Sequence, residues 1–527
     1  MWEVLTNIPW WVYLIIILAV WAFADITQKK HAVKHNFPIV GHFRYLLESI
    51  GPELRQYIVA NNREELPFNR RQRSWIYASS KKENNYQGFG TDQDMSSAGY
   101  VLIKPALLPT HLPDDHPHSI INTNHPYHYT LPSAKLIGEF HQRAKPYRPR
   151  SVINISAMSY GSLSANAIMA LNRGAAKFGC YHNTGEGGLS PYHKLGADVV
   201  FNIGTSYFGV RDHAGNLDMD RLARLTEGNP CIKMLELKLS QGAKPGKGGV
   251  LPASKITSEI AEIRGVPMGK DIVSRPYHTA FSNIPEMVEL IEEMASRTGL
   301  PVGIKSAVGK LEMWEELAKT MVETGKGPDF IAIDGGEGGT GAAPPSFADH
   351  VSLPFVYAFA HVYKIFQRYH LTERVAFIAS GKLGLPDKAV MAFAMGADLV
   401  AVAREAMMSI GCIQAQLCHT NRCPVGVATN NRWLVAGLDP TLKSERFYNY
   451  MKTFTKEIIE ITHAAGYEHP CQFTMEDVDL SMGDNNITQS LRLSHGYDKD
   501  RVKFDGLQSL VNCPYLGNVN TSPGILN

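Results

Sequence analysis

The sequence has little of what marks several common classes of protein. Its 527 residues include seven Cys, an odd number that is too small for a disulfide framework. Charged residues make up 19%, below the roughly 25% of typical soluble domains, and the formal net charge is +2. A near-neutral chain argues against nucleic acid as a partner. Because 44% of the residues are apolar, the chain can build a sizeable core, which excludes a disordered or fibrous protein.

Charge is missing altogether from one stretch near the N-terminus, where 21 residues separate Glu3 from Asp25. As a helix, this run would cover a hydrocarbon core of about 30 Å, and Trp10 and Trp21 lie near its two ends, where amphipathic rings favour the membrane interface. A secretory signal peptide is the main competing interpretation, because residues 22–24 resemble a small-residue cleavage site. A positive n-region is lacking, however, so we predict a single-pass membrane anchor over residues 1–30.

The charges that flank this run predict its orientation. Lys29, Lys30 and Lys34 follow the apolar stretch, together with His31, whereas Glu3 is the one charged residue before it. By the positive-inside rule, the rest of the chain lies in the cytoplasm, next to an inner or cytoplasmic membrane.

The sequence pattern of residues 31–150 changes along the segment. Their first part has apolar residues at helical spacing, whereas residues 105–132 are rich in Pro and His and irregular in pattern. The five His residues of that stretch match no compact ligand spacing, so a loop that lies over a larger domain is favoured over a metal site. We therefore expect residues 31–150 to pack on the domain that follows.

Short apolar runs alternate with helical patterns from residue 151 to about residue 430. Nearly continuous apolar strands between helices indicate a parallel sheet that is covered on both sides. Eight such units favour an α/β fold of the (β/α)₈ TIM-barrel type, with a doubly wound sheet as the alternative, although no GxGxxG opens the first helix. The expected strands are 152–156, 180–183, 199–203, 232–238, 302–306, 330–334, 375–380 and 399–403, and helices are expected over 164–177, 284–298, 310–324, 355–368 and 387–394. Residues 431–527 form a C-terminal extension, with one amphipathic helix over about 445–465 and a polar tail.

Polar and Gly-rich residues recur directly after these expected strands, where barrels gather their active groups. Glycine at a strand end lets the backbone approach a ligand closely and offers unobstructed N–H donors. We expect the phosphate of a cofactor to bind at the last two strand-end loops. These contain Ser380 and Gly381 in one and Ala403 and Arg404 in the other.

Three of the seven cysteines fall within twelve residues. Cys412, Cys418 and Cys423 have the spacing C-x5-C-x4-C, and Pro424 follows the last of them. Zinc sites usually place their thiolates two to four residues apart in two pairs. Three sulfur ligands followed by Pro favour a three-iron iron–sulfur cluster, with reduced buried thiols as the alternative.

Long ordered motifs carry a family resemblance over about residues 150–430. They are SAMSYGSLS (156–164), NTGEGG (183–188), KLSQGAKPGKGG (238–249), DGGEGGTGA (334–342) and CIQAQLCHTNRCPVGVAT (412–429). Together they resemble the FMN-binding synthase domain of glutamate synthases. The resemblance implies FMN in the barrel mouth and a 3Fe-4S cluster on Cys412, Cys418 and Cys423. It also implies that 2-iminoglutarate, formed from 2-oxoglutarate and ammonia, is reduced to glutamate.

The same resemblance assigns roles to single residues. Glu186 and Lys244 are expected to take part in catalysis, and Gln241, Lys244 and Arg264 to hold the 2-oxo acid, whose carboxylates suit cations. Glu186 would handle protons during imine formation, and Lys238 would stabilise a reduced, anionic flavin. The residues expected around FMN are Met158, Ser159, Lys238, Lys305, Asp334, Gly335, Gly336, Ser380, Gly381, Ala403 and Arg404.

Two departures from the family pattern bear on the substrate. Lys247 and Val250 stand where the family commonly has Glu and Gln, which puts strict 2-oxoglutarate specificity in doubt. The start of the sequence carries no N-terminal Cys nucleophile of a glutaminase, and no Gly fingerprint of a nicotinamide or FAD module is found. We therefore expect ammonia or another amine, and an external electron donor protein or subunit, as partners.

Three functions remain open from the sequence. The first is a membrane-anchored, glutamate synthase-like oxidoreductase that acts on CH-NH2 donors. The second is an FMN barrel transferase, for example one that forms N-alkyl-glutamate without net redox change. The third is a non-catalytic electron-transfer subunit.

Overall fold

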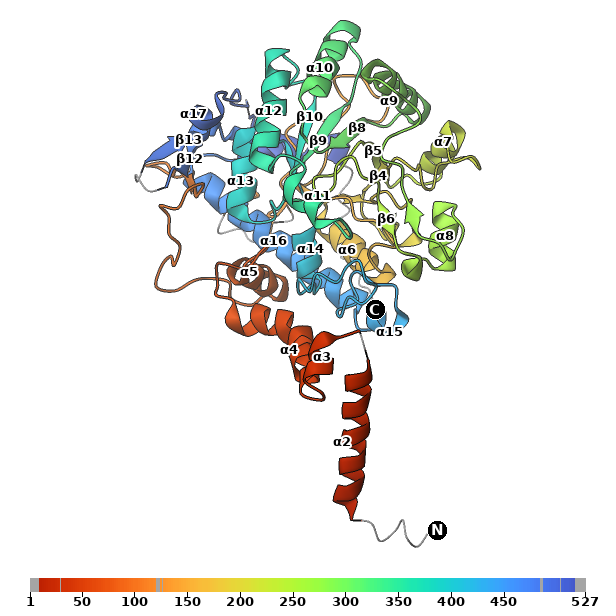
Figure 1. Ribbon diagram of the computed structural model, residues 1–527. Helices are drawn as coiled ribbons and strands as arrows, with labels where there is room; N and C mark the ends of the chain where they lie inside the picture. The colour runs from red at the N-terminus through yellow and green to blue at the C-terminus, as the bar shows by residue number, and fades with distance from the viewer. Residues whose placement is uncertain are drawn as a thin grey trace. The chain divides into compact units, whose positions relative to one another are not determined.

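Figure 1 shows the computed structural model of the chain, which describes residues 9–28, 30–119, 124, 125, 127–483, 487–502 and 504–516. Glu3 and Lys29, on which the predicted orientation rests, lie outside the described residues, as does the end of the polar tail. The chain divides into two compact units, Met1–Arg73 and Ser74–Asn527, which we describe separately.

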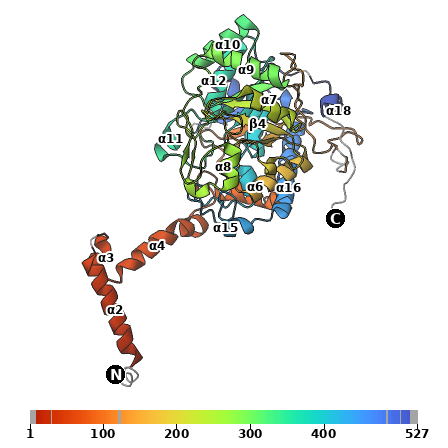
Figure 2. The ribbon, with the colours of Figure 1, turned by 90° about the vertical axis from the view of Figure 1, so that its right-hand side faces the viewer.

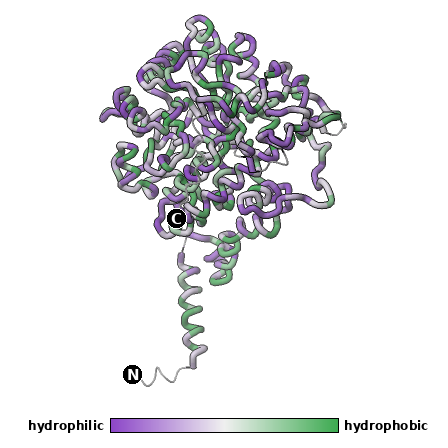
Figure 3. The backbone as a smooth tube through the Cα atoms, turned by 180° about the vertical axis from the view of Figure 1, so that it is seen from behind, coloured by the Kyte–Doolittle hydropathy of each residue, from purple (hydrophilic) through white to green (hydrophobic). Residues whose placement is uncertain are grey.

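The first unit is helical, with α2 (Trp10–Thr27), α3 (Ala32–Asn36), α4 (Gly41–Leu54) and a π-helical turn at Arg55–Val59. Among the described residues, α2 is the one helix that is long and apolar enough to cross a membrane, with a mean hydropathy of 1.9. Figure 3 shows this apolar character along its middle. The Asp25 carboxylate joins α2 to the next segment, because it accepts from the Ile39 N–H at 2.8 Å and lies 2.8 Å from His42 Nε2.

Helix α4 also presents an apolar side that is not covered. Its side chains recur at three- and four-residue spacing, as in an amphipathic helix, and they are exposed: Phe43, Leu46, Leu47, Ile50 and Leu54.

The second unit is built around a closed barrel of eight parallel strands, which confirms the predicted fold class and excludes the open doubly wound sheet. Strand β11 closes the barrel by pairing with β2, so that Val400 lies opposite Ile153. The barrel strands are β2 (Ile153–Ile155), β3 (His182–Asn183), β4 (Val199–Ile203), β5 (Ile232–Lys238), β8 (Val302–Ser306), β9 (Phe330–Asp334), β10 (Ala376–Ser380) and β11 (Leu399–Val402).

Helices cover the outside of the barrel, and their ends follow local sequence signals. Ser164 and Asn283 cap the first turns of α6 and α9 through their side chains, whereas Gly179 and Gly299 end the same helices in the left-handed conformation. The outer helices are α6 (Ala165–Phe178), α7 (Met219–Glu227), α9 (Ile284–Thr298), α10 (Glu312–Thr324), α12 (Phe355–Arg368), α13 (Pro386–Met395) and α14 (Arg404–Ser409).

The segments before and after the barrel meet on its outside. Helix α5 (Arg70–Lys81) stands at the boundary of the two units, and β1 (Val101–Ile103) pairs antiparallel with β12 (Val478–Ser481). The long helix α16 (Pro440–Ala464) runs beside α6 (Figures 1 and 2). Gly174 of α6 permits this approach, because a Cβ there would overlap the Phe447 ring.

The His-rich stretch 105–132 is irregular, and residues 120–123 and 126 of it lie outside the described residues. His118 and His128 are buried, and each has a backbone carbonyl partner, that of Thr130 for His118 and that of Pro117 for His128. These rings therefore serve the packing of the loop itself.

An insertion between β5 and β8 completes the unit. It comprises the two-stranded hairpin of β6 (Val250–Leu251) and β7 (Ile272–Val273), with α8 (Ser258–Arg264) between its strands. This insertion lies at the carboxyl end of β5, where it takes part in the site described next. The remaining helices are α11 (Pro345–His350), α15 (Arg432–Ala436), α17 (Leu491–His495) and α18 (Leu507–Val511), and β13 (Thr488–Ser490) pairs with β12.

Candidate active site

Four charged or polar residues end neighbouring barrel strands, as the sequence predicts. The strand register places Lys238 of β5 opposite Lys305 of β8, and Asp334 of β9 opposite Ser380 of β10. Because parallel strands of a barrel end at one rim, these side chains meet there.

The Asp334 carboxylate is the centre of one hydrogen-bonded group. It lies 3.5 Å from Lys305 Nζ, and it accepts from Ser380 Oγ at 2.9 Å and from the Gly242 N–H at 3.0 Å. Burial opposes the charge of Lys305, but Asp334 and Glu236 outweigh burial, so the pKa of Lys305 lies above its ordinary value. This lysine is therefore a fixed cation inside the barrel.

A second ion pair lies at the mouth of the barrel, between Glu186 of the loop after β3 and Lys238. Lys238 Nζ lies 3.1 Å from Glu186 Oε1 and donates to Gln241 Oε1 at 2.8 Å. Burial favours the neutral acid of Glu186, but Lys238, followed by Arg264 and Lys244, lowers its pKa below the ordinary value. At neutral pH Glu186 is a carboxylate, and therefore able to accept a proton.

These residues line a narrow cavity of about 20 Å³. Its wall includes four of the predicted site residues, namely Glu186, Lys238, Gln241 and Lys244. Lys244 donates to the Ala342 carbonyl, and burial, followed by the neighbouring Lys238, lowers its pKa. We call this cavity the inner pocket.

Arg264, predicted to hold the substrate, is not among the residues that line the inner pocket. It is 4% exposed, and its Nη2 donates to the Tyr160 carbonyl at 2.9 Å. Burial lowers the pKa of Arg264 to about 10, although the charge of Glu186 opposes this effect. Its Nε has no hydrogen-bond partner, so this buried guanidinium retains one unused donor close to Glu186.

Glycines let the loops around the inner pocket interlock. A Cβ at Gly242 would overlap the Gly335 carbonyl oxygen, one at Gly248 the Ser274 carbonyl oxygen, and one at Gly249 the Glu186 carboxylate. The Gly-rich motifs thus serve close backbone packing at the strand ends.

The residues predicted to grip a phosphate lie next to this group. Ser380 Oγ is occupied by Asp334, and Gly381 is in the left-handed region with φ +131°. Arg404, which begins α14 after Ala403, donates to the Glu337 carbonyl. Met158 and Ser159 follow β2, and Ser159 Oγ donates to Ser162 Oγ at 3.1 Å.

The loop that carries Cys412, Cys418 and Cys423 is fastened to the loops after β2 and β6. Ser164 Oγ donates to the Gly426 carbonyl at 2.7 Å, and Asn430 Nδ2 to the Gly161 carbonyl at 3.0 Å. Burial, followed by the neighbouring Cys423, raises the pKa of the Cys418 thiol. The carbonyl of Cys412 accepts from Tyr77 Oη at 2.8 Å. In the described part of the chain, no three His, Cys, Asp or Glu gather closely enough to hold a single metal ion.

Lys255, which the motifs do not single out, lies against this loop. It is 3% exposed, and its Nζ donates to the Ser162 carbonyl at 2.7 Å and to the Cys418 carbonyl at 3.3 Å. No carboxylate of the described residues forms an ion pair with it. Burial lowers the pKa of Lys255 to about 8, and the charges that oppose burial are those of Cys418 and Cys423.

His278 is a second residue that the sequence analysis missed, because it stands in the insertion after β5, outside any recognised motif. Its Nε2 lies 2.8 Å from the Lys238 carbonyl, so Nε2 carries the proton and donates. Its Nδ1 then accepts from Tyr207 Oη at 3.1 Å. The backbone of Lys238 is therefore held by a neutral imidazole.

Comparison with known proteins identifies the family. A family model described as the conserved region in glutamate synthase matches residues 115–468. A Bacillus subtilis protein described as glutamate synthase large subunit-like protein YerD is 39% identical over 508 residues, which are 92% of this chain and 96% of that protein. The chain belongs to the glutamate synthase family. It is thus a glutamate synthase-like oxidoreductase, and the resemblance drawn from the motifs is confirmed.

Other relatives share only part of their length with this member of the glutamate synthase family. The archaeal glutamate synthase (NADPH) of Methanocaldococcus jannaschii is 35% identical over 318 residues, which are 60% of this chain and 59% of that protein. The large chain of glutamate synthase (NADPH) from Bacillus subtilis is 32% identical over 326 residues, which are 20% of its length. Among solved structures, mandelate oxidase R163L aligns with a TM-score of 0.42 at 12% identity, over 78% of this chain and 90% of that one. The assignment of the fold rests on the closed barrel itself.

His278 predicts a pH dependence of stability. Burial lowers its pKa to about 4, so the folded barrel excludes a proton that the unfolded chain binds below about pH 6.5. The stability that this neutral ring contributes is complete above pH 6.5 and is lost as the pH falls towards 4, by about 3 kcal/mol in all. The free energy of unfolding can be measured by urea unfolding at pH 7, 6, 5 and 4.5. As the pH falls, it should decrease less in His278→Gln than in the parent.

The exposed His350 offers the matched control, since the free energy of unfolding of His350→Gln should depend on pH as it does in the parent. If the free energy of unfolding fell equally with pH in the parent and in His278→Gln, the imidazole of His278 would not be neutral in the folded protein.

Proposed function

We propose that this chain uses FMN and a 3Fe-4S cluster to reduce a 2-imino acid, formed from a 2-oxo acid and ammonia or an amine, to an amino acid. The preferred candidate is 2-iminoglutarate, formed from 2-oxoglutarate. The observation that carries the proposal is the inner pocket, where an ionised Glu186 is surrounded by Lys238 and Lys244, with Arg264 behind it. Cations around one carboxylate suit a small acidic substrate that must exchange protons during the reaction.

The rim of the barrel fits FMN on two observations. Lys238 and Lys305 are cations at the ends of adjacent strands, as an anionic reduced flavin requires. The glycine loops after β9 and β10 bring backbone rather than side chains to the same rim. When bound, FMN would supply the hydride for the carbon–nitrogen double bond. The residues that would hold it are Met158, Ser159, Lys238, Lys305, Asp334, Gly335, Gly336, Ser380, Gly381, Ala403 and Arg404.

The residues of the inner pocket have distinct roles in this proposal. Gln241 and Lys244 would bind the substrate carboxylates, and the unused Nε donor of Arg264 would add a further contact. The Glu186 carboxylate would carry two protons in turn from the adding nitrogen to the 2-oxo oxygen. The first would turn that oxygen into a hydroxyl, and the second would let the hydroxyl leave as water, which completes the imine.

Catalysis by Glu186 is testable by flavin reoxidation. The purified protein, reduced anaerobically with dithionite, is mixed with a panel of 2-oxo acids with and without ammonium. At least one 2-oxo acid should speed reoxidation in the presence of ammonium, and Glu186→Gln should slow this step about 10²- to 10⁴-fold, as expected for loss of a general base.

Glu262→Gln is the control, because Glu262 is an exposed acid of α8 and should leave the rate unchanged. Product formed from an amino donor without any reductant would favour the transferase instead. Reversible reduction without any effect of substrate would favour the electron-transfer subunit and contradict the proposal.

The iron–sulfur cluster is proposed for Cys412, Cys418 and Cys423, and Lys255 supports it. A buried cation without a carboxylate partner is costly, and thiolates that carry a cluster would provide the missing negative charge beside it. The cluster would accept single electrons from an external donor protein or subunit.

Cysteine substitution tests the cluster. Iron analysis and electron paramagnetic resonance of the oxidised parent should show a three-iron signal, and Cys418→Ser should lose both the signal and most of the iron, because one of three ligands is removed. Cys231→Ser, at a half-buried cysteine outside this loop, should keep both. An unchanged signal in Cys418→Ser would contradict this set of ligands.

We further propose that α2 anchors the chain in an inner or cytoplasmic membrane as a single span, with the barrel in the cytoplasm. Eighteen helical residues extend about 27 Å, close to the thickness of the hydrocarbon core. Lys30 and Lys34 follow the span in the sequence, between it and the barrel, as expected for the cytoplasmic end of a span. The exposed apolar side of α4, which α2 joins through Asp25, suits the membrane interface.

Charge in the span tests the anchor. The double substitution Ile16→Arg/Ile17→Arg should move the protein from carbonate-washed membranes into the soluble fraction, since each arginine at a helix centre costs about 3 kcal/mol on insertion. Val322→Arg, at an exposed valine of α10, should leave the protein in the membrane fraction. Equal recovery of both variants from washed membranes would exclude a transmembrane α2.

A further inference from the structure

The insertion after β5 carries two buried cations. Lys255 precedes α8 and is 3% exposed, whereas Arg264 ends α8 and is 4% exposed. The charge of Glu186 opposes the effect of burial on Arg264, so that guanidinium has an anion nearby. No carboxylate of the described residues forms an ion pair with Lys255. The groups whose negative charge would balance it are the thiols of Cys418 and Cys423.

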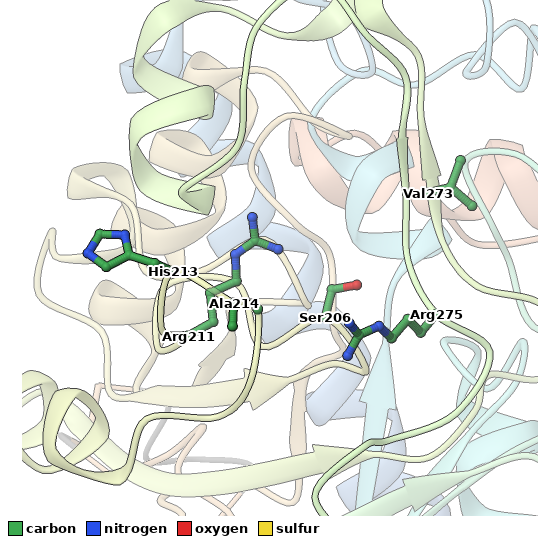
Figure 4. Close-up of a pocket in the computed structure, with 7 residues that line it drawn as sticks. Ser206, Arg211, His213, Ala214, Val273 and Arg275 are labelled. Carbon is green, nitrogen blue, oxygen red and sulfur yellow. The ribbon is translucent and has the colours of Figure 1, made fainter.

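Other cations near this insertion are solvated. Figure 4 shows a cavity of about 220 Å³ that Arg211 and Arg275 line, with Arg275 reaching in beside Ser206. Arg275 is exposed and Arg211 is half-buried, so water has access to both charges. Lys255, in contrast, is almost fully removed from water, and a charge in such a place is screened far less.

The Lys255 ammonium joins two loops that end at the barrel rim. Its Nζ donates to the Ser162 carbonyl at 2.7 Å and to the Cys418 carbonyl at 3.3 Å. Ser162 belongs to the loop after β2, which also carries Met158 and Ser159. Cys418 belongs to the segment 412–430, which we call the cysteine loop. The ammonium therefore lies between the loop proposed to contact FMN and the loop proposed to carry the iron–sulfur cluster.

Amide side chains hold the backbone of Lys255 in this place. Asn430 Nδ2 donates to the Gly161 carbonyl at 3.0 Å and to the Lys255 carbonyl at 2.7 Å. Asn421 Nδ2 donates to the Ser254 carbonyl at 2.7 Å. Because these bonds do not involve the lysine side chain, the cysteine loop stays attached to the insertion when that side chain is replaced.

A buried cation beside an iron–sulfur cluster affects how readily the cluster is reduced. Reduction adds one negative charge, so a nearby cation stabilises the reduced state more than the oxidised state. The reduction potentials of such clusters depend on net charge, hydrogen bonds and solvent exposure. Lys255 contributes a charge in a place from which water is excluded.

We propose that Lys255 raises the reduction potential of the cluster on Cys412, Cys418 and Cys423, and so favours the transfer of one electron to it from the external donor protein. Lys255 acts through its charge and touches no reacting atom, which makes it a positioning residue. This inference rests on the proposed function, since it takes the cysteine loop as the site of the cluster.

A redox titration followed by electron paramagnetic resonance tests the inference without turnover. The full-length protein in detergent is reduced stepwise at pH 7, and the loss of the three-iron signal gives the midpoint potential. Lys255→Gln keeps a hydrogen-bond donor but removes the charge. At the midpoint potential of the parent, its ratio of oxidised to reduced cluster should be at least about tenfold higher, a shift of about 59 mV to lower potential.

Two further variants separate charge from structure. Lys255→Arg keeps the charge and should stay within about twofold of the parent in the same ratio. Lys326→Gln removes an exposed lysine between α10 and β9 and should match the parent.

Each outcome of the titration decides one of the two proposals. Equal midpoint potentials in the parent and Lys255→Gln would overturn the role of Lys255 and leave the cluster in place. Loss of the signal in Lys255→Gln but not in Lys255→Arg would support a required charge, whereas loss in both would overturn it, because the shape of the side chain would then be what matters. Absence of the signal from the parent would refute the proposed cluster itself.

Discussion

The arrangement of side chains at the rim of the barrel depends most on the contacts of one group, the Asp334 carboxylate. It joins the ends of three strands and one loop, because it faces Lys305 of β8 and Ser380 of β10 and accepts from the Gly242 N–H after β5. A buried carboxylate in this position balances a buried lysine and uses its lone pairs on groups that are far apart in sequence. The loops that form the inner pocket start from strand ends that this one side chain links to one another.

Much of the fold could be predicted from the sequence, because the barrel strands are continuous apolar runs and the helices between them have clear periodicity and caps. The register of a closed parallel barrel then brings Lys238, Lys305, Asp334 and Ser380 to one rim without further information. The insertion after β5 could not be predicted in the same way, since its strands β6 and β7 are two residues long and have no periodicity. The pairing of β1 with β12 was missed as well, because strands so distant in sequence leave no local signal.

The candidate site, like the fold, could be predicted from the sequence only in part. Motifs identified which residue types gather around the inner pocket, but the partners of those residues depend on side-chain packing in three dimensions. Arg264 illustrates this, because its guanidinium is buried against the Tyr160 carbonyl and does not line the pocket. Lys255 was missed because a lone lysine in an irregular segment has no spacing to mark it. Its significance follows only from its burial.

The crowding around Gly248 and Gly249 limits how residues 247–250 can change by mutation. A Cβ at Gly248 would overlap the Ser274 carbonyl, which is a backbone group, whereas a Cβ at Gly249 would displace the Glu186 carboxylate from its place beside Lys238. Of the neighbouring positions, Lys247 is exposed and Val250 is half-buried, and these are the two at which this sequence departs from the family motif. Substitutions at these two positions can therefore change the surface beside the inner pocket, while the backbone turn between them and the geometry around Glu186 stay the same.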